Sequence, residues 1–390
     1  MTRVLLDARK ARDFGIGRYI VGLLGALARR GGFDLSAAIH PGDEGLLPDG
    51  VRTVVCRAGH YSPEELVAVR QVIARVRPDL FHAPHYVMPF FPPAATVVTI
   101  HDLMHLHRPE HASLPRRAYA RWMVGRATRL AARVIAVSEA MKKEILAFAP
   151  GHGGKVEVIP NGVEERFFLE GEEGNAGARR MPAPPVRLPS FEGPYLLFLG
   201  NDKPHKNLDG LLAAWSGLRR TRPGLSLVLA GVGPGRALPE GVKAPGFVPN
   251  AELPALVAGA RLLVLPSFSE GFGLPVAEAM AAGTPVACSD LPALREVAGD
   301  AASYFDPHDV TSIARAMAEL LGDEGRRDLL RRKGKERAAA LTWEAAAERT
   351  ARLYRDVLAG ISGKSPGGPG GSRNPREEKS PGGTEKPPGS

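Results

Sequence analysis

Short apolar runs that alternate with longer amphipathic stretches constrain the fold of this 390-residue chain more than any other feature. In the first half, the apolar runs lie at residues 4–6, 80–82, 96–100, 134–137 and 156–159. In the second half, they lie at residues 195–199, 225–230, 262–265, 284–288 and 302–305. Helical stretches such as 207–220 and 274–282 separate them. This alternation is typical of a parallel β-sheet covered by helices, so the sequence predicts an α/β protein.

The length of the chain and one break in this pattern predict two domains. A domain commonly has about 100–200 residues, and the segment 169–194 is rich in Gly, Pro and charge, as a connection would be. We therefore expect one domain over residues 1–168, completed by a C-terminal helix at about 344–360, and a second over 195–343. Residues 362–390 contain almost no apolar side chain and are predicted to be disordered.

The charge and the cysteine content restrict partners and compartment. A formal net charge of +9 favours an anionic partner, which is nucleic acid, a membrane surface or a phosphorylated ligand. The sequence shows neither a signal peptide nor an apolar stretch long enough to span a bilayer, which predicts a soluble or peripheral protein. Cys56 and Cys288 are far apart, and this usage fits the reducing cytoplasm.

The strongest functional motif is SFSEGFGLPVAEAMAAGTPV, at residues 267–286. A strand ends, a glycine-containing loop follows, and a helix is expected to begin near Leu274. Free backbone N–H groups and a helix N-terminus at the carboxyl edge of a parallel sheet suit a diphosphate. Glu270 in the loop and Glu278 one turn into the helix can serve one ligand, at a sugar and at a ribose diol. The alternative is a tight turn with a solvated glutamate.

The spacing of Glu270 and Glu278 matches the E-x7-E motif of glycosyltransferase family 4, and the wording EGFGLPVAEAMAAGTPV resembles that family closely. The resemblance extends from about residue 4 to residue 358. It implies a GT-B fold, in which two Rossmann-like domains have parallel sheets facing across a cleft, and a retaining transferase. It also implies that Glu270 contacts the transferred sugar and Glu278 the nucleotide ribose. The backbone N–H groups implied to hold the diphosphate belong to Gly271, Phe272, Gly273 and Leu274.

A basic loop follows the first apolar run of the second half, in LFLGNDKPHKNLDGLL at residues 197–212. Positive charge beside a helix N-terminus favours phosphate. In the family this loop commonly carries an arginine and a lysine that bind the diphosphate. Lys206 fills the lysine position, whereas Asn201 stands where the arginine is usual, and Lys203 is the residue we expect to compensate. A solvated basic loop is the alternative.

A histidine-containing segment, VVTIHDLMHLHRPEH, follows the run at residues 96–100. His101 comes at the end of the predicted strand, where open α/β sheets place ligands, and the resemblance implies that it contacts the transferred sugar. A purely structural His101 is the alternative. The spacing of His101, His105, His107 and His111 matches no zinc motif, so no metal site is predicted.

The glycine-rich turn ARDFGIGRYI follows the first apolar run. Gly17 is expected to bring the backbone near the donor, with Arg18 adding a cation, although a GxG pattern alone also fits a plain turn. The resemblance supports the functional interpretation, because the first loop of the family lines the cleft. Asn161 and Gly162, in VIPNGV, are expected to form a structural turn near the cleft.

A basic helix is expected at residues 114–133. The apolar side chains that fall broadly on one side of it are Tyr119, Trp122, Met123 and Leu130. The arginines around them are Arg116, Arg117, Arg121, Arg126 and Arg129. One interpretation is a helix packed on the sheet with a basic solvent face; the other is a surface for anionic lipid at the inner face of the membrane. No nucleic-acid-binding signature accompanies the charge, so nucleic acid is not expected as a partner.

The resemblance carries the remaining functional expectations. The segment GNDKPHKNL resembles the corresponding sequence of bacterial enzymes of polysaccharide and O-antigen biosynthesis. This resemblance favours transfer of mannose from GDP-mannose over transfer from a UDP-sugar. The acceptor is expected to be a glycan or a lipid-linked oligosaccharide. No Asp-x-Asp motif occurs, so catalysis is predicted to need neither metal nor cofactor. A sugar-nucleotide 2-epimerase and a catalytically silent nucleotide-sugar-binding protein are the alternatives.

Overall fold

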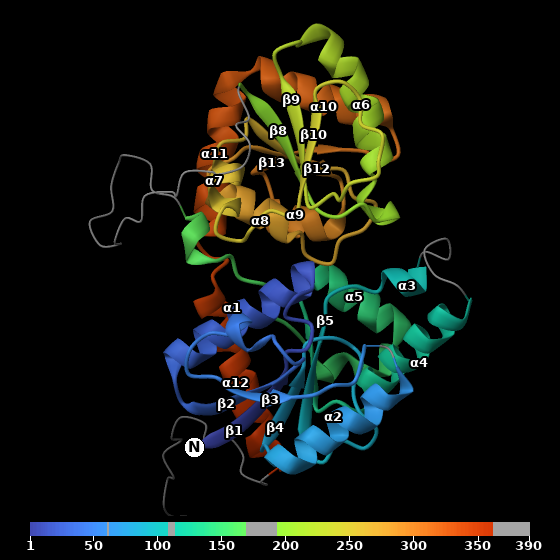
Figure 1. Cartoon of the computed structure of the whole chain (residues 1–390), viewed down its shortest axis with the longest axis vertical. Coiled ribbons are helices and arrows are strands. Elements are labelled where there is room, and N and C mark those ends of the chain that lie inside the picture. Colours follow the sequence, from blue (N-terminus) through green and yellow to red (C-terminus); the bar gives the residue numbers. More distant parts are fainter. Residues whose placement is uncertain (61, 108–113, 169–192, 362–390) are drawn as a thin grey trace, which may run out of the picture.

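The computed structural model describes residues 1–60, 62–107, 114–168 and 193–361. These residues form two parallel sheets, each covered by helices and stacked one above the other along the long axis of the molecule (Figure 1). The connection expected at 169–194 lies almost entirely outside the described residues, and the tail at 362–390 lies outside them completely.

The N-terminal unit is built on a seven-stranded sheet in the order β3-β2-β1-β4-β5-β6-β7. Its strands are β1 Thr2–Asp7, β2 Phe33–Ile39, β3 Arg52–Val55, β4 Leu80–Ala83, β5 Ala95–Ile100, β6 Arg133–Ala136 and β7 Val156–Val158. Its helices are α1 Phe14–Arg30, α2 Pro63–Val76, α3 Met104–His107, α4 Leu114–Leu130 and α5 Glu139–Phe148. Short 3-10 turns are η1 Glu44–Leu46, η3 Pro150–Lys155 and η4 Glu165–Phe167.

The C-terminal unit is built on a six-stranded sheet in the order β10-β9-β8-β11-β12-β13. Its strands are β8 Tyr195–Leu199, β9 Ser226–Ala230, β10 Val242–Gly246, β11 Leu262–Leu265, β12 Val286–Ser289 and β13 Ala302–Phe305. Its helices are α6 Leu208–Thr221, α7 Leu253–Ala258, α8 Leu274–Ala281, α9 Pro292–Ala298, α10 Val310–Gly322 and α11 Glu324–Ala338, with η5 at Pro204–Lys206.

Both sheets have a point at which the strand order reverses. Strands β8 and β11 are completely buried, because helices cover both faces, and this explains their continuous apolar sequence. The order reverses between β1 and β4 in the first sheet and between β8 and β11 in the second. Loops that leave the carboxyl ends of such strands form the crevice in which open α/β sheets bind ligands.

The last helix, α12 Trp343–Ile361, returns to the N-terminal unit and packs against α1 (Figure 1). The Trp343 ring is buried against Gly22, where any side chain on α1 would collide with it. Tyr354 is also completely buried. The C-terminal end of the described chain is therefore part of the core that supports the first sheet.

Across the described parts of the chain, no helix has both the length and the apolar character needed to cross a membrane. Cys56 and Cys288 are both buried and free, and burial raises the pKa of each thiol.

Candidate active site

The loop between β11 and α8 brings the two units into contact. Gly273 caps α8 in the left-handed conformation, with φ of 97°, and a side chain there would collide with Leu294. Gly271 lies against the carbonyl oxygen of His101, so that no other residue fits without a shift of the backbone. Ser138 Oγ, at the start of α5, donates a hydrogen bond of 2.7 Å to the Gly271 carbonyl. The glycines thus place the N-terminus of α8 beside the first sheet.

Lys206 and Glu270 meet at the reversal point of the second sheet. Lys206 Nζ lies 2.6 Å from Glu270 Oε1, and Ser267 Oγ donates to the same oxygen at 2.6 Å. The loops after β8 and β11 carry these side chains, and those strands are neighbours. Two residues that the sequence predicts to be catalytic, 64 positions apart, are therefore in direct contact.

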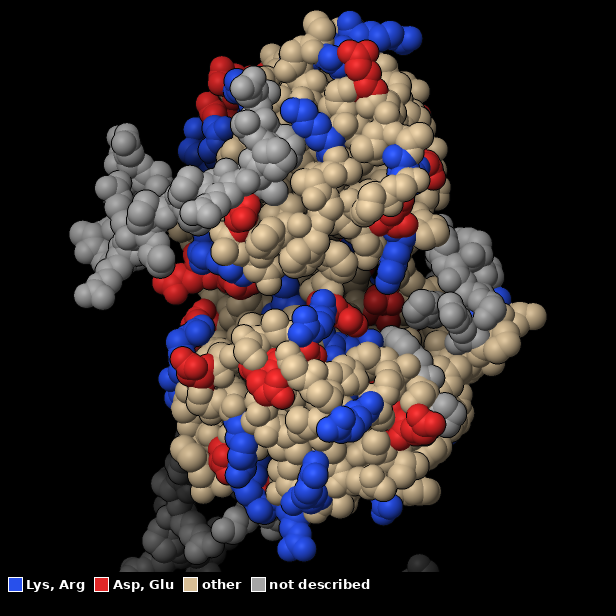
Figure 2. Space-filling model, viewed as in Figure 1, with Lys and Arg blue, Asp and Glu red and all other residues tan. Residues whose placement is uncertain are grey.

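Glu278 lies one turn into α8 and pairs with Arg18 of α1, so this ion pair joins the two units. Arg18 Nη1 donates to Glu278 Oε1, whereas Glu278 Oε2 is buried and has no hydrogen-bond partner among the described residues. Burial raises the pKa of the Glu278 carboxyl, and the charge of Arg18 opposes that rise. The space-filling view shows basic and acidic atoms on the walls of the hollow between the two units (Figure 2).

Gly17 is explained by close packing at the start of α1. Its N–H donates to the Asp13 carbonyl at 2.8 Å, and a side chain would collide with the backbone of Ala11. The glycine therefore lets the first turn of α1 lie against the preceding loop, with the next residue, Arg18, directed to Glu278.

His101 follows β5 and lies close to the glycine loop. Burial lowers the pKa of His101 to about 4, although a hydrogen bond to the Pro84 backbone opposes this shift. The ring is therefore neutral at pH 7. Its Nε2 is buried without a partner in the described parts of the chain. The Tyr19 ring packs edge-on against it at 4.7 Å between centroids. A neutral imidazole that donates to Pro84 leaves Nε2 as an acceptor for a hydroxyl group.

A buried hydrogen-bond chain supports Tyr19. Tyr19 Oη and His82 Nε2 each lie 2.8 Å from Thr99 Oγ1, and His82 Nδ1 lies 2.5 Å from Tyr354 Oη. This hydrogen-bond chain was not predicted from the sequence. The signal present was a polar residue inside each of two apolar runs, His82 in β4 and Thr99 in β5.

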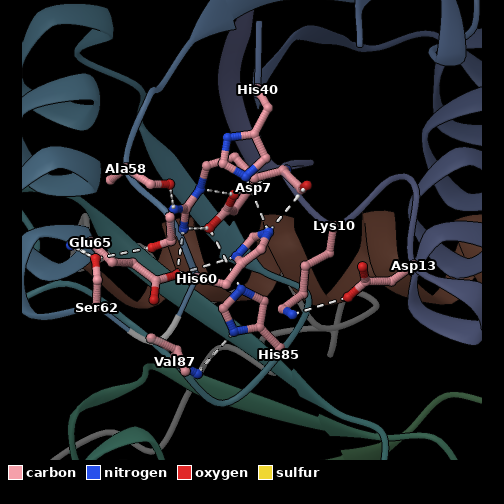
Figure 3. Close-up of polar contacts among 12 residues, drawn as sticks. Asp7, Lys10, Asp13, His40, Ala58, His60, Ser62, Glu65, His85 and Val87 are labelled. Carbon is pink, nitrogen blue, oxygen red and sulfur yellow. Dashed lines mark hydrogen bonds and ion pairs between the residues drawn. The ribbon is translucent and has the colours of Figure 1, made fainter. Parts of the chain in front are cut away.

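A second buried network lies at the carboxyl edge of the first sheet (Figure 3). Ligand atoms of Asp7, Glu65 and His85 lie within 4.8 Å of one another, which is close enough for a shared metal ion. However, Arg9 Nη2 lies 2.6 Å from Asp7 Oδ2 and 2.8 Å from Glu65 Oε1, so its guanidinium takes the place of a metal ion.

Arg9 offsets part of the negative charge of this network. Burial alone raises the pKa of Asp7, but the charge and hydrogen bonds of Arg9, together with His85, hold it well below its ordinary value. We therefore interpret the network as a support for the loops under the site. The network was not predicted from the sequence, because no spacing motif links these residues.

The other predicted site residues are placed as follows. Phe272 is buried, Leu274 is half-buried, and Lys203 is exposed. Asn201 is half-buried, and its Oδ1 has no hydrogen-bond partner within the described ranges. His111 lies outside the described residues. That Lys203 replaces the family arginine stays a prediction.

The basic helix differs from its expected form in two ways. It ends at Leu130 rather than at residue 133, which belongs to β6. Arg126 is buried and donates to the carbonyl oxygens of Met88 and Pro89, each at 2.8 Å. The expectation that Arg126 belongs to an exposed basic face is therefore wrong, because these two loop carbonyls need a buried donor.

Comparisons with known proteins agree with this geometry. Residues 15–167 match the family described as Glycosyltransferase Family 4, and residues 187–337 match Glycosyl transferases group 1. The chain is 30% identical to O-antigen chain mannosyltransferase B of Escherichia coli over 288 residues, which cover 71% of this chain and 74% of that protein. It is 29% identical to D-inositol 3-phosphate glycosyltransferase of Segniliparus rotundus, over 58% of this chain and 53% of that protein, about half its length.

A solved structure shows the same architecture. Sucrose-phosphate synthase from Thermosynechococcus elongatus superposes with a TM-score of 0.71 at 23% identity, covering 92% of this chain and all of that one. Together, the two facing parallel sheets and the site between them define a glycosyltransferase of the GT-B fold. More specifically, the chain belongs to glycosyltransferase family 4. The resemblance inferred from the E-x7-E motif is confirmed, and the 2-epimerase alternative is not favoured.

Proposed function

We propose that the protein is a retaining hexosyltransferase that transfers a sugar, mannose being favoured, from a nucleoside-diphosphate donor to a glycan or lipid-linked acceptor in cell-surface polysaccharide biosynthesis. The observation that carries this proposal is the contact of Lys206 with Glu270 beside the start of α8, with Glu278 one turn further along. The similarity to an O-antigen chain mannosyltransferase supports mannose and the polysaccharide pathway.

The donor is assigned to the cleft between the two units. Its diphosphate binds the N–H groups at the start of α8 and Lys206, its ribose hydroxyls donate to Glu278, and its sugar contacts Glu270 and His101. Oε2 of Glu278 and Nε2 of His101 support these assignments, because each is a buried acceptor that receives no donor from the described residues. Hydroxyl groups of a nucleotide-sugar supply such donors.

The reaction proceeds by front-face substitution. The acceptor hydroxyl oxygen bonds to the anomeric carbon on the face from which the diphosphate leaves, the bond from that carbon to the phosphate oxygen breaks, and the hydroxyl proton passes to the departing phosphate. No protein nucleophile is needed, so the protein contributes position and charge. Lys206 stabilises the negative charge that develops on the diphosphate.

Catalysis is proposed to be independent of metal and cofactor. The positive charge that a divalent ion supplies elsewhere comes here from the Lys206 ammonium and from the N-terminal dipole of α8. The absence of an Asp-x-Asp sequence supports this assignment, because that motif holds the ion in nucleotide-sugar enzymes of the other major fold.

The helix α4 and the loop before β5 are proposed to contact the anionic inner face of the cytoplasmic membrane. Phe91 and Trp122 are 79% and 45% exposed, and the Phe90 and Trp122 rings lie 5.9 Å apart. Arg121 and Arg129 are exposed on the same helix. Exposed aromatic side chains beside arginines suit an anionic bilayer surface, where a lipid-linked acceptor would be held.

A transfer assay tests the proposal. The purified protein is incubated in chelator with GDP-mannose, UDP-glucose or UDP-N-acetylglucosamine and a panel of soluble and lipid-linked glycans, and products are identified by mass spectrometry and NMR. The proposal expects one donor to give a product with the donor's anomeric configuration. An inverted product, or conversion of a UDP-sugar to its epimer without an acceptor, would contradict it.

A further inference from the structure

We infer that Arg18 is a donor-binding residue contributed by the N-terminal unit, which exchanges its ion pair with Glu278 for the donor's diphosphate when a ribose takes Glu278. This inference rests on the proposed function and deepens it, because it assigns a second diphosphate-binding cation and couples donor binding to the contact between the two units.

The first observation is that the Arg18–Glu278 ion pair closes the ribose position. The side chains of Arg18 and Glu278 are only 14% and 3% exposed. A ribose therefore reaches the Glu278 carboxylate only after Arg18 has moved. Arg18 belongs to α1 and Glu278 to α8, 260 positions later in the chain, so the same movement breaks a contact between the units.

The second observation is that Glu278 is only partly satisfied by Arg18. Oε1 accepts from Arg18, whereas Oε2 is buried and lacks a partner within the described ranges. A ribose diol brings two hydroxyl donors, which match the two oxygens of one carboxylate. The exchange therefore improves the hydrogen bonding of Glu278, provided that Arg18 finds another anion. A buried charge left alone is strongly destabilising, so Arg18 needs such a partner.

The donor's diphosphate is the partner that the geometry offers. Glu278 lies about one helical turn, or roughly 5.4 Å of rise, from the start of α8, where the diphosphate is assigned. The planar guanidinium of an arginine matches phosphate oxygens with two parallel hydrogen bonds. Asn201, at the usual arginine position of this family, offers no charge, so the proposed site has room for a second cation beside Lys206.

Other contacts keep the two units together while Arg18 exchanges partners. Glu296 of α9 accepts hydrogen bonds from the N–H groups of Glu139 and Ala140, at 2.7 and 3.1 Å, at the N-terminus of α5. Ser138 donates to Gly271 in the same place. Breaking the Arg18 pair therefore opens the ribose position without separating the units.

The test compares nucleotides that differ only in the diphosphate. Calorimetry gives the Kd of GDP and UDP, and of guanosine and uridine by competition, for the wild-type protein, Arg18→Gln and Arg18→Lys. We expect Arg18→Gln to raise the Kd of the nucleoside diphosphate that the wild type binds by about tenfold or more. The nucleoside should bind equally well or more tightly, because its competitor for Glu278 is gone. The diphosphate Kd of Arg18→Lys should lie between those of the wild type and Arg18→Gln.

The outcomes separate this inference from the proposed function. If Arg18→Gln changes the diphosphate Kd by less than twofold, or weakens diphosphate and nucleoside equally, the inference is wrong and the proposed function stands. If the wild type binds no nucleotide, both are wrong. Arg52→Gln, which removes an exposed ion pair with Asp34, is the matched control and should bind like the wild type. If Arg18→Gln does not fold, as judged by circular dichroism, Arg18→Lys decides: an unchanged diphosphate-to-nucleoside ratio would overturn the inference.

Discussion

Tyr354, in the last helix, places its hydroxyl 2.5 Å from Nδ1 of His82, a residue of the first sheet 272 positions earlier. Through Thr99 and Tyr19, the same hydrogen-bond chain reaches the ring that packs against His101. The helix that ends the described chain is thus connected to a candidate sugar-binding histidine. Substitutions in this helix are expected to act on the site as well as on stability.

The stability of the protein should fall in acid because of its buried histidines. Burial lowers the pKa of His82 to about 3 and that of His101 to about 4, whereas both are near 6.5 in an unfolded chain. The unfolded state therefore binds more protons below pH 6.5, and the free energy of unfolding decreases from there towards pH 3. Urea denaturation across this range should show a smaller decrease for His82→Gln than for the wild type. An identical pH dependence would contradict the assignment.

Arg9→Met should destabilise the N-terminal unit severely. The substitution leaves the buried carboxylates of Asp7 and Glu65 without their cation, and breaking a buried pair in this way costs about 3–5 kcal/mol. Urea denaturation measures the loss. The matched control is Arg52→Met, whose exposed pair with Asp34 should contribute less than about 1 kcal/mol. Similar decreases in the free energy of unfolding of the two variants would show that the buried network stabilises the protein no more than an exposed ion pair does.

Lys206→Ala should reduce turnover at least about a hundredfold, which corresponds to about 3 kcal/mol, because it removes a cation from the departing diphosphate. The measurement is kcat at saturating donor in the transfer assay. The control for loss of a lysine is Lys333→Ala on α11, which removes an exposed pair with Asp300 and should leave kcat unchanged. Near-normal turnover of Lys206→Ala would remove this residue from the mechanism.

Binding to anionic vesicles should depend on α4. The protein is expected to sediment with vesicles that contain phosphatidylglycerol but not with vesicles of phosphatidylcholine alone, and added salt should release it. Each arginine near the surface contributes about 1 kcal/mol, so Arg121→Gln should weaken binding about fivefold. Trp122→Ser should weaken vesicle binding more than Arg121→Gln does. The control Arg52→Gln should bind vesicles like the wild type. Equal binding to both kinds of vesicle would argue against the charged surface.

The buried parallel strands and the motif helix could be predicted from the sequence, because both depend on local patterns. Strands β8 and β11 are apolar throughout, and α8 begins at Leu274 after a glycine, as expected. Three strands, β2, β3 and β10, were not predicted because they lack a clear apolar run. Asp34 and Ser36 interrupt β2, the edge strand β3 is mostly exposed, and β10 contains a proline.

The contacts between distant residues could not be predicted in this way. The Arg18–Glu278 pair depends on how the two sheets face one another, and no spacing in the sequence records that arrangement. Burial of Arg126 depends on two carbonyl groups in a loop that the sequence leaves undefined. Lys206 and Glu270, by contrast, each lie within a local sequence motif, so both were predicted to be site residues. Their direct contact was not predicted.

Nucleotide binding in the presence of a chelator tests the central claim most directly. Calorimetry is performed with GDP-mannose, GDP, UDP-glucose, UDP-N-acetylglucosamine and UDP, on the wild type and on Glu278→Ala. The account predicts that one base series binds without metal, that GDP-mannose is the favoured donor, and that Glu278→Ala loses most of this affinity. Binding that appears only after magnesium or manganese is added, or an unchanged Kd in Glu278→Ala, would contradict the account.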